Sequence, residues 1–384
     1  MESLWRYTPD IFGLLLSFVV QWQLFGWIAG WVRPRWRTPV LVLRVVVSAW
    51  VTLAFLFSLP PVYRYIPTGG WRAWAKAFGM GWAIIAAVIW GIEWTFRLLE
   101  KLWPAFDPSR RQALGIVRNA ALAAPAATIG YGVFIGRHDF RLREIEIPVR
   151  GLAKDLHGLR MVQLTDIHMS PFLSATDLEH AIGIANEAKA HVALMTGDLI
   201  SVKGDPLDDC IRLLARIKTD AGLIGCLGNH EIVADCEEYV TSEAARSGMR
   251  FLRSEAHALR FGNARINFAG VDYQRKGKPY LPDAEALIEP ATFNVLLSHN
   301  PDVFPVAARM GYDLTIAGHT HGGQVTVEIL HQYANIARFY TPYVYGHYEE
   351  FGRSAYVSRG LGTIGIPARV GAPPEVALIK LCAT

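Results

Sequence analysis

Four long apolar stretches lie in the first part of the chain, and they constrain its fold more than any other feature. Each has 18 to 21 residues and at most one charged residue: Ile11–Trp31, Leu41–Leu59, Ala77–Phe96 and Asn119–Gly136. About 20 apolar residues suffice for a helix to cross a bilayer, whereas buried soluble helices, the alternative, usually keep a polar face. We expect about four transmembrane helices in a membrane domain of residues 1–138, with Arg44 and Glu93 reaching the interface, and a second domain of residues 139–384.

Tryptophan, histidine and charge divide the chain in the same way. All 12 tryptophans lie between Trp5 and Trp103, and all 12 histidines lie at His138 or later. Trp is enriched at membrane interfaces, whereas His supplies metal ligands and acid–base groups. Residues 1–136 carry 13 Lys/Arg and 5 Asp/Glu, and the remainder carries 25 and 29. The second domain therefore lacks the basic stripe of a nucleic-acid-binding surface, and we expect no nucleic-acid partner.

Basic residues in the short loops predict the orientation of the helices. Placing the first and third loops in the cytoplasm puts nine basic residues there: Arg33, Arg35, Arg37, Arg44, Arg97, Lys101, Arg110, Arg111 and Arg118. Seven face the other side: Arg6, Arg64, Arg72, Lys76, Arg137, Arg141 and Arg143. This agrees with the positive-inside bias. Ser109-Arg110-Arg111 before Ala120–Ala127 also resembles a twin-arginine export signal, although a basic helix flank has the same pattern. Both patterns place the second domain outside the cytoplasm.

Short apolar strands alternate with helical segments after residue 139. The strands are expected at Arg143–Pro148, Leu159–Thr165, His191–Thr196, Leu223–Leu227, Ile266–Ala269, Phe293–Ser298, Leu314–Ala317, Tyr356–Ser358 and Val376–Leu381. The helices are expected at Thr176–Ala190, Pro206–Ile217 and Glu237–Ser247. This alternation predicts an α/β domain.

Polar clusters follow five of the predicted strands. They are Asp166-Ile167-His168, Gly197-Asp198, Gly228-Asn229-His230-Glu231, Ser298-His299 and Gly318-His319-Thr320-His321. Ligands of open α/β sheets bind at the carboxyl ends of strands. Residues two apart in an extended chain point to the same side, so Asp166 and His168 should project together, as should His319 and His321. Oxygen and imidazole donors without a thiolate favour Mn, Fe or Zn.

In residue type and order, these clusters resemble the pattern of calcineurin-like metallophosphoesterases. That pattern runs D-x-H, G-D, G-N-H-[DE], a lone His and G-H-x-H, and the match extends from Asp166 to His321. The resemblance implies a four-layer α-β-β-α sandwich with two central sheets. It also implies a hydrolase that uses two divalent metal ions.

The resemblance further implies a role for each residue. Each ion would have three ligands of its own: Asp166, His168 and His321 for one, and Asn229, His299 and His319 for the other. Asp198 would bridge the two ions and take part in catalysis, with a bridging hydroxide as the nucleophile. His230 would be catalytic rather than a ligand, contacting the phosphate or protonating the leaving group. Glu231 would orient the site.

Three further segments resemble a membrane-associated branch of this family around YkuE and YaeI, and the animal transmembrane proteins with a metallophosphoesterase domain. They are Thr165–Phe172, Ser358–Thr363 and Gly371–Glu375. The resemblance implies a membrane-associated bacterial protein that hydrolyses a phosphate ester or phosphodiester, and the loop charges place its catalytic domain outside the cytoplasm. The apolar loop Pro171–Leu173 suits a lipid or nucleotide-lipid substrate, although ordinary loop packing gives the same pattern.

Two other functions remain open at this point. Some relatives are linked to UDP-2,3-diacylglucosamine hydrolysis, so a pyrophosphatase of lipid A biosynthesis is one alternative; it would require the domain to face the cytoplasm. The other is a non-enzymatic, metal-dependent membrane sensor or binding module.

Several residues outside the five clusters receive weaker predictions. Arg359 and Arg369 flank the Gly-rich segment Gly360–Gly371 and are candidates for substrate binding. The other histidines are expected to be structural or exposed: His138, His157, His180, His191, His257, His331 and His347. The oligomeric state and the pairing of the four cysteines stay open; Cys226–Cys236 and Cys210–Cys236 are the disulfides considered.

Overall fold

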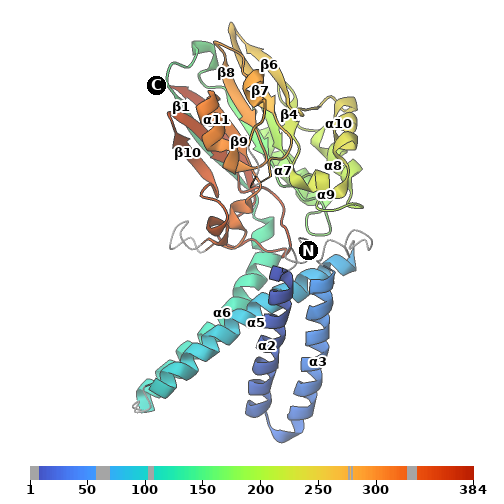
Figure 1. The fold of residues 1–384 in the computed structure, drawn as a ribbon, viewed down its shortest axis with the longest axis vertical. Helices are drawn as coiled ribbons and strands as arrows, with labels where there is room; N and C mark the ends of the chain where they lie inside the picture. Colours follow the sequence, from blue (N-terminus) through green and yellow to red (C-terminus); the bar gives the residue numbers. More distant parts are fainter. Residues whose placement is uncertain (1–7, 58–69, 103–107, 276, 278–279, 327–334) are drawn as a thin grey trace. The chain divides into compact units, whose positions relative to one another are not determined.

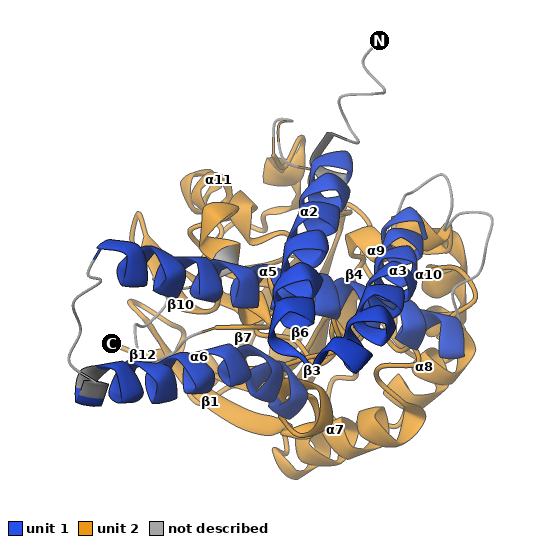
Figure 2. Ribbon diagram, turned by 90° about the horizontal axis from the view of Figure 1, so that it is seen from below, with its two compact units in different colours: residues 1–131 blue, residues 132–384 orange. Residues whose placement is uncertain are grey.

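The chain divides into two compact units, residues 1–131 and 132–384, in the computed structural model (Figures 1 and 2). The structure describes all residues except 1–7, 58–69, 103–107, 276, 278–279 and 327–334. Five positions named above lie outside the described residues: Trp5, Arg6, Arg64, Trp103 and His331. The end of the second apolar stretch, from residue 58, lies outside them as well. The sequence places the domain boundary after residue 138, whereas the second unit begins at Gly132, within the fourth long helix.

The first unit consists of long apolar helices, as the sequence predicts. They are α2 (Thr8–Trp31), α3 (Pro34–Leu56), α5 (Trp71–Leu102) and α6 (Pro108–Phe134). By length and composition, four segments are able to cross a membrane: Ile11–Trp31, Pro34–Leu56, Trp71–Leu102 and Arg111–His138. Val20 and Leu24 of α2 pack on Ala86 of α5. The expectation of four helices apolar enough to span a membrane is confirmed.

Glu93 of α5 is buried within the helical unit. Its side chain is buried at 1% exposure and is paired with two arginines. Arg97 donates to Glu93 Oε1 at 2.8 Å, and Arg118 of α6 donates to Oε2 at 2.8 Å. A buried carboxylate requires such partners, because an unpaired charge in an apolar environment is costly. The snorkelling expected of Glu93 is therefore replaced by an ion-pair cluster.

The second unit is built on two six-stranded mixed sheets. The first has the order β1 (Arg141–Val149), β12 (Glu375–Ala383), β2 (Arg160–Leu164), β3 (Val192–Thr196), β4 (Leu223–Cys226) and β5 (Arg250–Phe251). The second has the order β10 (Gly346–Glu350), β11 (Arg353–Val357), β9 (Leu314–Ala317), β8 (Phe293–Leu297), β7 (Ala264–Gly270) and β6 (Glu255–Phe261). β1 lies at the edge of the first sheet and pairs in parallel with β12.

The helices of this unit are short. They are α7 (Ala175–Glu187), α8 (Leu207–Leu214), α9 (Asn229–Ala234), α10 (Glu237–Arg246) and α11 (Phe304–Met310). Single 3₁₀ turns connect several elements: η1 (Gly136–His138), η2 (Lys154–Leu156), η3 (Ala284–Leu287), η4 (Pro301–Val303), η5 (His321–Gly323) and η7 (Ile336–Phe339).

Alternating side chains show that the two sheets stack face to face between helical layers. In β3, Val192 and Leu194 enter the core between the sheets, whereas Ala193 packs in a second core that α7 and α8 share with the first sheet. In β8, Val295 enters the core between the sheets, and Leu296 packs on the side of α11. This period of two is the geometry of a strand buried on both faces. The expected α/β sandwich is confirmed (Figure 1).

Parallel pairing brings five strand ends to one edge of this sandwich. β2, β3 and β4 are parallel neighbours in the first sheet, and β8 and β9 are parallel neighbours in the second. The carboxyl ends of parallel strands meet at the same edge of a sheet, where α/β proteins bind ligands. Each of the five polar clusters follows one of these strands.

Candidate metal centre

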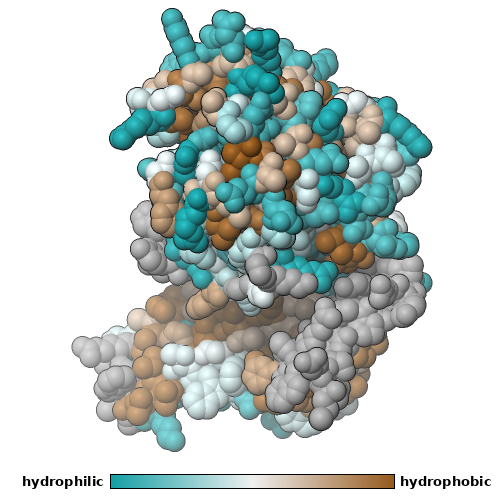
Figure 3. All heavy atoms as spheres, turned by 45° about the horizontal axis from the view of Figure 1, so that its top comes forward, coloured by the Kyte–Doolittle hydropathy of each residue, from teal (hydrophilic) through white to brown (hydrophobic). Residues whose placement is uncertain are grey.

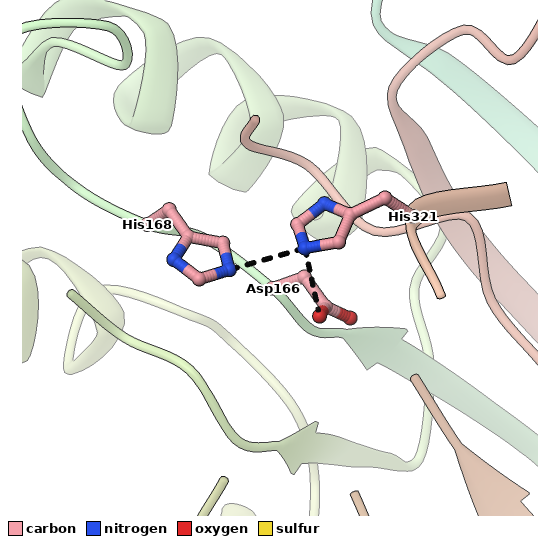
Figure 4. Close-up of side chains that lie close together, drawn as sticks. All are labelled: Asp166, His168 and His321. Carbon is pink, nitrogen blue, oxygen red and sulfur yellow. Dashed lines mark hydrogen bonds and ion pairs between the residues drawn. The ribbon is translucent and has the colours of Figure 1, made fainter. Parts of the chain in front are cut away.

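Asp166, His168 and His321 form the first group of potential ligands (Figure 4). Asp166 and His168 follow β2, and His321 begins η5 after β9. The Nε2 atoms of His168 and His321 lie 3.2 Å apart, and His321 Nε2 lies 3.4 Å from Asp166 Oδ1. All three side chains are buried. Nitrogen and oxygen atoms that converge in this way match the donor set of a Mn, Fe or Zn ion.

Asp198, His299 and His319 form the second group. They follow β3, β8 and β9, so both sheets contribute. His299 Nε2 lies 3.0 Å from Asp198 Oδ2, and His319 Nδ1 lies 3.1 Å from His299 Nε2. This group again offers two imidazole nitrogens and one carboxylate oxygen.

A single oxygen of Asp198 lies between the two groups. Asp198 Oδ2 is 3.0 Å from His299 Nε2 and 3.4 Å from His168 Nε2. The other oxygen, Oδ1, accepts a hydrogen bond of 2.8 Å from the main-chain N–H of His230. Gly228 allows this approach, because a Cβ atom there would lie 2.2 Å from Asp198 Oδ1. Asp198 therefore has the position that a bridging carboxylate requires.

Asn229 completes the set of predicted ligands with a buried amide oxygen. Its Oδ1 atom is buried and has no hydrogen-bond partner among the described residues. A buried polar atom without a partner is costly, and nearly all such atoms in folded proteins are satisfied. Asn229 begins α9, next to the His230 amide that binds Asp198. A divalent cation that prefers oxygen donors would satisfy this atom, so the residues present fit a metal ion.

The histidines are oriented by hydrogen bonds on the ring nitrogen that faces away from the ligand groups. His299 Nδ1 donates to the Thr196 carbonyl at 2.6 Å, which leaves Nε2 as the nitrogen that faces Asp198. His168 Nδ1 lies 3.2 Å from Ser201 Oγ. Partners of this kind fix the tautomer of metal-binding histidines.

Glu231 joins two of the ligand loops. Its carboxylate accepts three main-chain hydrogen bonds, from Asp198 at 3.0 Å, Leu199 at 2.7 Å and Gly228 at 2.7 Å. The side chain is fully buried. Burial and the charge of Asp198 raise the pKa of Glu231, against the effect of these hydrogen bonds. Its position agrees with the orienting role that the sequence suggests.

Ligand residues adopt a left-handed backbone, which corrects part of the sequence argument. Five of them have positive φ values: Asp166 (50°), His168 (48°), Asp198 (59°), His319 (74°) and His321 (52°). The chain there is not extended, so the expectation that each pair converges because the chain is extended is wrong. Non-glycine residues rarely adopt this region, and such strain concentrates at functional sites. Asp166 and His168 join the same group, whereas His319 and His321 are divided between the two groups.

The electrostatics leave three imidazoles uncharged. Burial lowers the pKa of His168 to about 3, with the neighbouring His230 acting in the same direction. Burial also lowers the pKa of His319 to about 3, and that of His321 well below its ordinary value. Neutral imidazoles have the lone pair that a metal ion needs. For His299, burial lowers the pKa but the carboxylates of Asp198 and Asp166 raise it to about 10. In the protein without a cation, a proton on His299 therefore balances the carboxylates.

His230 lies beside the ligands in a fixed orientation. Its Nδ1 donates to the Ser201 carbonyl at 2.5 Å, because a carbonyl only accepts. Its ring is perpendicular to that of His168, with centroids 4.6 Å apart. This contact turns Nε2 to the other side of the ring. His230 also forms a third group of potential ligands with His168 and Asp198.

Arg369, a candidate for substrate binding from the sequence, is buried and binds the main chain instead. Its side chain is 1% exposed, and its guanidinium donates to four main-chain carbonyls, those of His321, Arg359, Gly362 and Ala372. It therefore positions the His321 loop rather than offering its charge to a substrate. Arg359 is also buried, with its guanidinium 4.2 Å from the Tyr345 ring centroid. The idea that these two bind substrate directly is not supported by their surroundings.

Tyr273 borders the second group and was missed from the sequence. Its hydroxyl lies 3.5 Å from His319 Nε2, and its ring contacts the rings of His299 and His319. Tyr273 follows β7, which is parallel to β8. The rule that predicted the other ligands, a polar residue after a parallel strand, could also have indicated Tyr273.

The described histidines outside the five clusters, like the four cysteines, have no place in the ligand groups. Among the histidines outside the clusters, those that the structure describes do not join either ligand group. They contact residues elsewhere: His138 with Asp177, His157 with the Ala383 amide, His191 with the Arg160 amide and His347 with Ser354. All four cysteines are free, so neither disulfide considered above is present.

Comparison with known proteins agrees with the geometry. Residues 159–323 match the calcineurin-like phosphoesterase family. The uncharacterized metallophosphoesterase YkuE of Bacillus subtilis is 28% identical over 72% of this chain and 98% of its own length. A transmembrane protein with metallophosphoesterase domain from Danio rerio is 27% identical over 90% of this chain and 80% of its own length. The solved NAD nucleotidase of Haemophilus influenzae is a distant likeness, with a TM-score of 0.36 and 14% identity over 53% of this chain and 45% of that chain.

Proposed function

Residues 159–323 form a calcineurin-like phosphoesterase domain, and from this premise we propose that the chain is a membrane-anchored hydrolase of phosphate esters or phosphodiesters. The observation that carries the proposal is the position of Asp198 Oδ2 within 3.4 Å of both His168 Nε2 and His299 Nε2. One carboxylate oxygen between two sets of imidazoles suits a pair of divalent cations.

Seven side chains would hold the two cations. They are Asp166, His168, Asp198, Asn229, His299, His319 and His321. Two bound Mn, Fe or Zn ions would supply a water molecule of lowered pKa and neutralise charge on the phosphoryl oxygens. Glu231 would keep two ligand loops at the required separation, since it binds the main chain of both Asp198 and Gly228. Arg369 would hold the His321 loop against the Arg359 segment.

His230 would carry the proton in this reaction. With Nδ1 bound to the Ser201 carbonyl, Nε2 is available to donate to the leaving oxygen. The half-buried position of His230 gives this atom access to a substrate.

A lipid-linked phosphate ester is the substrate class we propose. Four helices able to span a membrane belong to the same chain, and the half-buried residues Pro171 and Phe172 follow the first ligand cluster. We further propose that the domain lies outside the cytoplasm of a bacterial cell, from the loop charges described above. The oligomeric state has no bearing on this proposal, since every proposed ligand comes from one chain.

Hydrolysis of a chromogenic phosphodiester tests the proposal. Full-length protein in nanodiscs would be treated with a chelator, reloaded with Mn²⁺, Fe²⁺ or Zn²⁺, and assayed with bis(p-nitrophenyl) phosphate. We expect metal-dependent turnover that His230→Ala lowers by about 10²-fold or more, with the bound metal retained. His180→Ala is the matched control, because His180 is exposed and outside the site. A protein that binds metal but gives no turnover on any phosphate ester would instead support the sensor alternative.

A further inference from the structure

Among the described residues of the second unit, four of the nine exposed large apolar side chains lie on segments connected to the candidate metal centre. Val233, Phe339, Tyr340 and Ile364 have exposed fractions of 43%, 89%, 71% and 40%. We call these four residues the apolar rim. Much of the remaining surface of this unit is polar, as the teal residues on one face show (Figure 3). Large apolar side chains exposed on the segments around a site are typical of an interaction surface.

Each segment of the apolar rim is attached to a ligand loop. Val233 lies on α9, the helix that begins with Asn229 and His230. Phe339 and Tyr340 lie at the end of η7, and the Asn335 side chain before this turn donates to the Gly322 carbonyl at 2.7 Å. Gly322 is the neighbour of His321. The two aromatic residues are thus held by a buried hydrogen bond beside a metal ligand.

Ile364 is attached to the other side of the same loop. Its carbonyl accepts a hydrogen bond of 3.1 Å from Gln324, which follows η5. Two residues earlier, the Gly362 amide donates to the Asp166 carbonyl at 2.7 Å. Ile364 is therefore placed by the loops that carry His321 and Asp166, and not by a flexible connection.

The end of the fourth potential membrane span packs against this segment. The segment Arg111–His138 is long and apolar enough to cross a membrane, and its residues from Gly132 onward belong to the second unit. The Arg369 amide donates to the Gly132 carbonyl at 3.1 Å. A Cβ atom on Gly132 would lie 2.7 Å from the Val370 side chain, so the helix end and the loop are in close contact. Phe134 and Ile135, next in the chain, are 72% and 58% exposed.

This packing connects an apolar helix end, the apolar rim and the metal centre within one unit. A span that ends at Gly132–Ile135 places those residues at the boundary between hydrocarbon and headgroups, where aromatic side chains are favoured. Because the 364–370 segment is bound to that helix end, its exposed Ile364 lies close to the same boundary.

We propose that the apolar rim inserts into the lipid surface and places the metal centre at the headgroup level, so that the site hydrolyses lipid-borne phosphate esters more efficiently than dissolved ones. The occupant of the rim is the acyl and headgroup boundary of the bilayer that holds this chain. The lipid preference rests on the proposed phosphoesterase function, whereas insertion does not depend on catalysis.

Spin labels on the full-length protein test the insertion directly. Nitroxides would be attached at Phe339→Cys or Ile364→Cys in a chain with Cys236→Ser and Cys382→Ala, reconstituted in vesicles of phosphatidylethanolamine and phosphatidylglycerol. Phe351→Cys is the matched control, because Phe351 is 62% exposed on the turn between β10 and β11, away from the ligand loops. The accessibility of each nitroxide to two relaxing agents would be measured. We expect nitroxides at 339 and 364 to be more accessible to oxygen, which concentrates in lipid. The nitroxide at 351 should be more accessible to a water-soluble nickel complex. Equal accessibility of the three nitroxides to the nickel complex would overturn the proposal. It would also be overturned if the nitroxides at 339 and 364 were shielded from the nickel complex only after a second protein was added.

Turnover of two substrates then tests the consequence for specificity. The double variant Phe339→Ser/Ile364→Ser should lower kcat/KM for a phosphatidic acid or a nucleotide-linked lipid in vesicles by about tenfold or more, because two apolar contacts with lipid are lost. Turnover of dissolved bis(p-nitrophenyl) phosphate should stay unchanged. If both substrates lose turnover equally, the rim affects the site itself and the lipid role is wrong. If the labels insert but the wild type hydrolyses neither substrate, the proposed hydrolase function fails while the membrane contact stands.

Discussion

Arg369 donates a hydrogen bond of 2.8 Å from Nη1 to the main-chain carbonyl of His321, and both residues are buried. The same guanidinium binds the Arg359 and Gly362 carbonyls, and the Arg369 amide binds Gly132. One residue therefore connects a metal-ligand loop with the end of an apolar helix. Burial lowers the pKa of Arg369 to about 10, so the group stays charged at neutral pH.

Replacing Arg369 by Lys should loosen the His321 loop. A lysine keeps the charge but lacks the planar fork that binds several carbonyls at once. We expect a loss of about 1–3 kcal/mol in the free energy of unfolding, since buried acceptors lose partners. Thermal unfolding in detergent would measure the change. Arg265→Lys is the control, because Arg265 pairs with Glu289 at the surface; equal effects of the two variants would show that Arg369 has no special positioning role.

Removing the Glu231 carboxylate should separate the two loops that it joins. In Glu231→Gln, the side chain keeps one acceptor oxygen. Its NH₂ group replaces the other oxygen and, as a donor, cannot accept a hydrogen bond from the main-chain N–H that faces it. We expect weaker Mn²⁺ binding, by about tenfold or more, as for other groups that orient metal ligands. Calorimetric titration with Mn²⁺ would measure the affinity. Glu238→Gln is the control at an exposed position, and an unaltered affinity in Glu231→Gln would remove the orienting role.

Asn229→Ala should selectively weaken one of the two cation positions. The variant removes the buried Oδ1 atom, which has no hydrogen-bond partner among the residues that the structure describes. We expect the amount of tightly bound Mn²⁺ to fall by about one ion per chain after dialysis, measured by elemental analysis, because a carbonyl-type ligand is lost. Asn263→Ala, at an exposed turn, should bind as much metal as the wild type. Undiminished metal in Asn229→Ala would exclude Asn229 as a ligand.

The start of α7 offers a test of pH dependence away from the metal centre. Burial acts to raise the pKa of Asp177, but hydrogen bonds from the Ser174 side chain and amide, and the contact with His138, lower it overall. A carboxyl group with a depressed folded-state pKa stabilises the fold above its ordinary pKa of about 3.9, and that contribution is lost as the pH falls through the lower folded value. Asp177→Asn should therefore unfold at a lower temperature than wild type at pH 7, and the two melting temperatures should converge in acid. A difference that is constant with pH would contradict this explanation.

Fusion reporters would establish which side of the membrane the second unit faces. A green fluorescent protein fused after Thr384 should stay dark in bacterial cells, because it does not become fluorescent after export in unfolded form, whereas one fused after Arg37 should fluoresce. A bright C-terminal fusion would place the domain in the cytoplasm. It would also favour the alternative function, a lipid A pyrophosphatase, over an extracytoplasmic phosphoesterase.

The candidate ligands could be predicted from the sequence, because strand ends and residue types are local features. Asp198 and His299 lie where the buried strands before them predict, at the carboxyl ends of β3 and β8. The reason given for the paired ligands was wrong, since the left-handed turns at Asp166 and His168 depend on hydrogen bonds to the loop after β3. Sequence patterns do not contain such contacts between distant loops.

Other features could not be read from the sequence because they depend on tertiary packing. Glu93 looks like a charge at the end of an apolar stretch, and only the approach of Arg118 from α6 shows that it is buried and paired. Arg369 looks like a basic residue in a glycine-rich loop, and its role appears only when four carbonyls from separate segments surround it. The same holds for the apolar rim, whose members are far apart in the chain.

Electron paramagnetic resonance of Mn²⁺-loaded protein, with Asp198→Asn beside the wild type, tests the central claim most directly. If Asp198 Oδ2 is shared by two ions, the wild type should bind two Mn²⁺ per chain and give the multiline spectrum of an exchange-coupled pair. The Asp198→Asn variant should lose that coupling, and with it the turnover of bis(p-nitrophenyl) phosphate. A wild-type spectrum of a single, uncoupled Mn²⁺ at saturating metal, or an unchanged coupled spectrum in Asp198→Asn, would contradict the account.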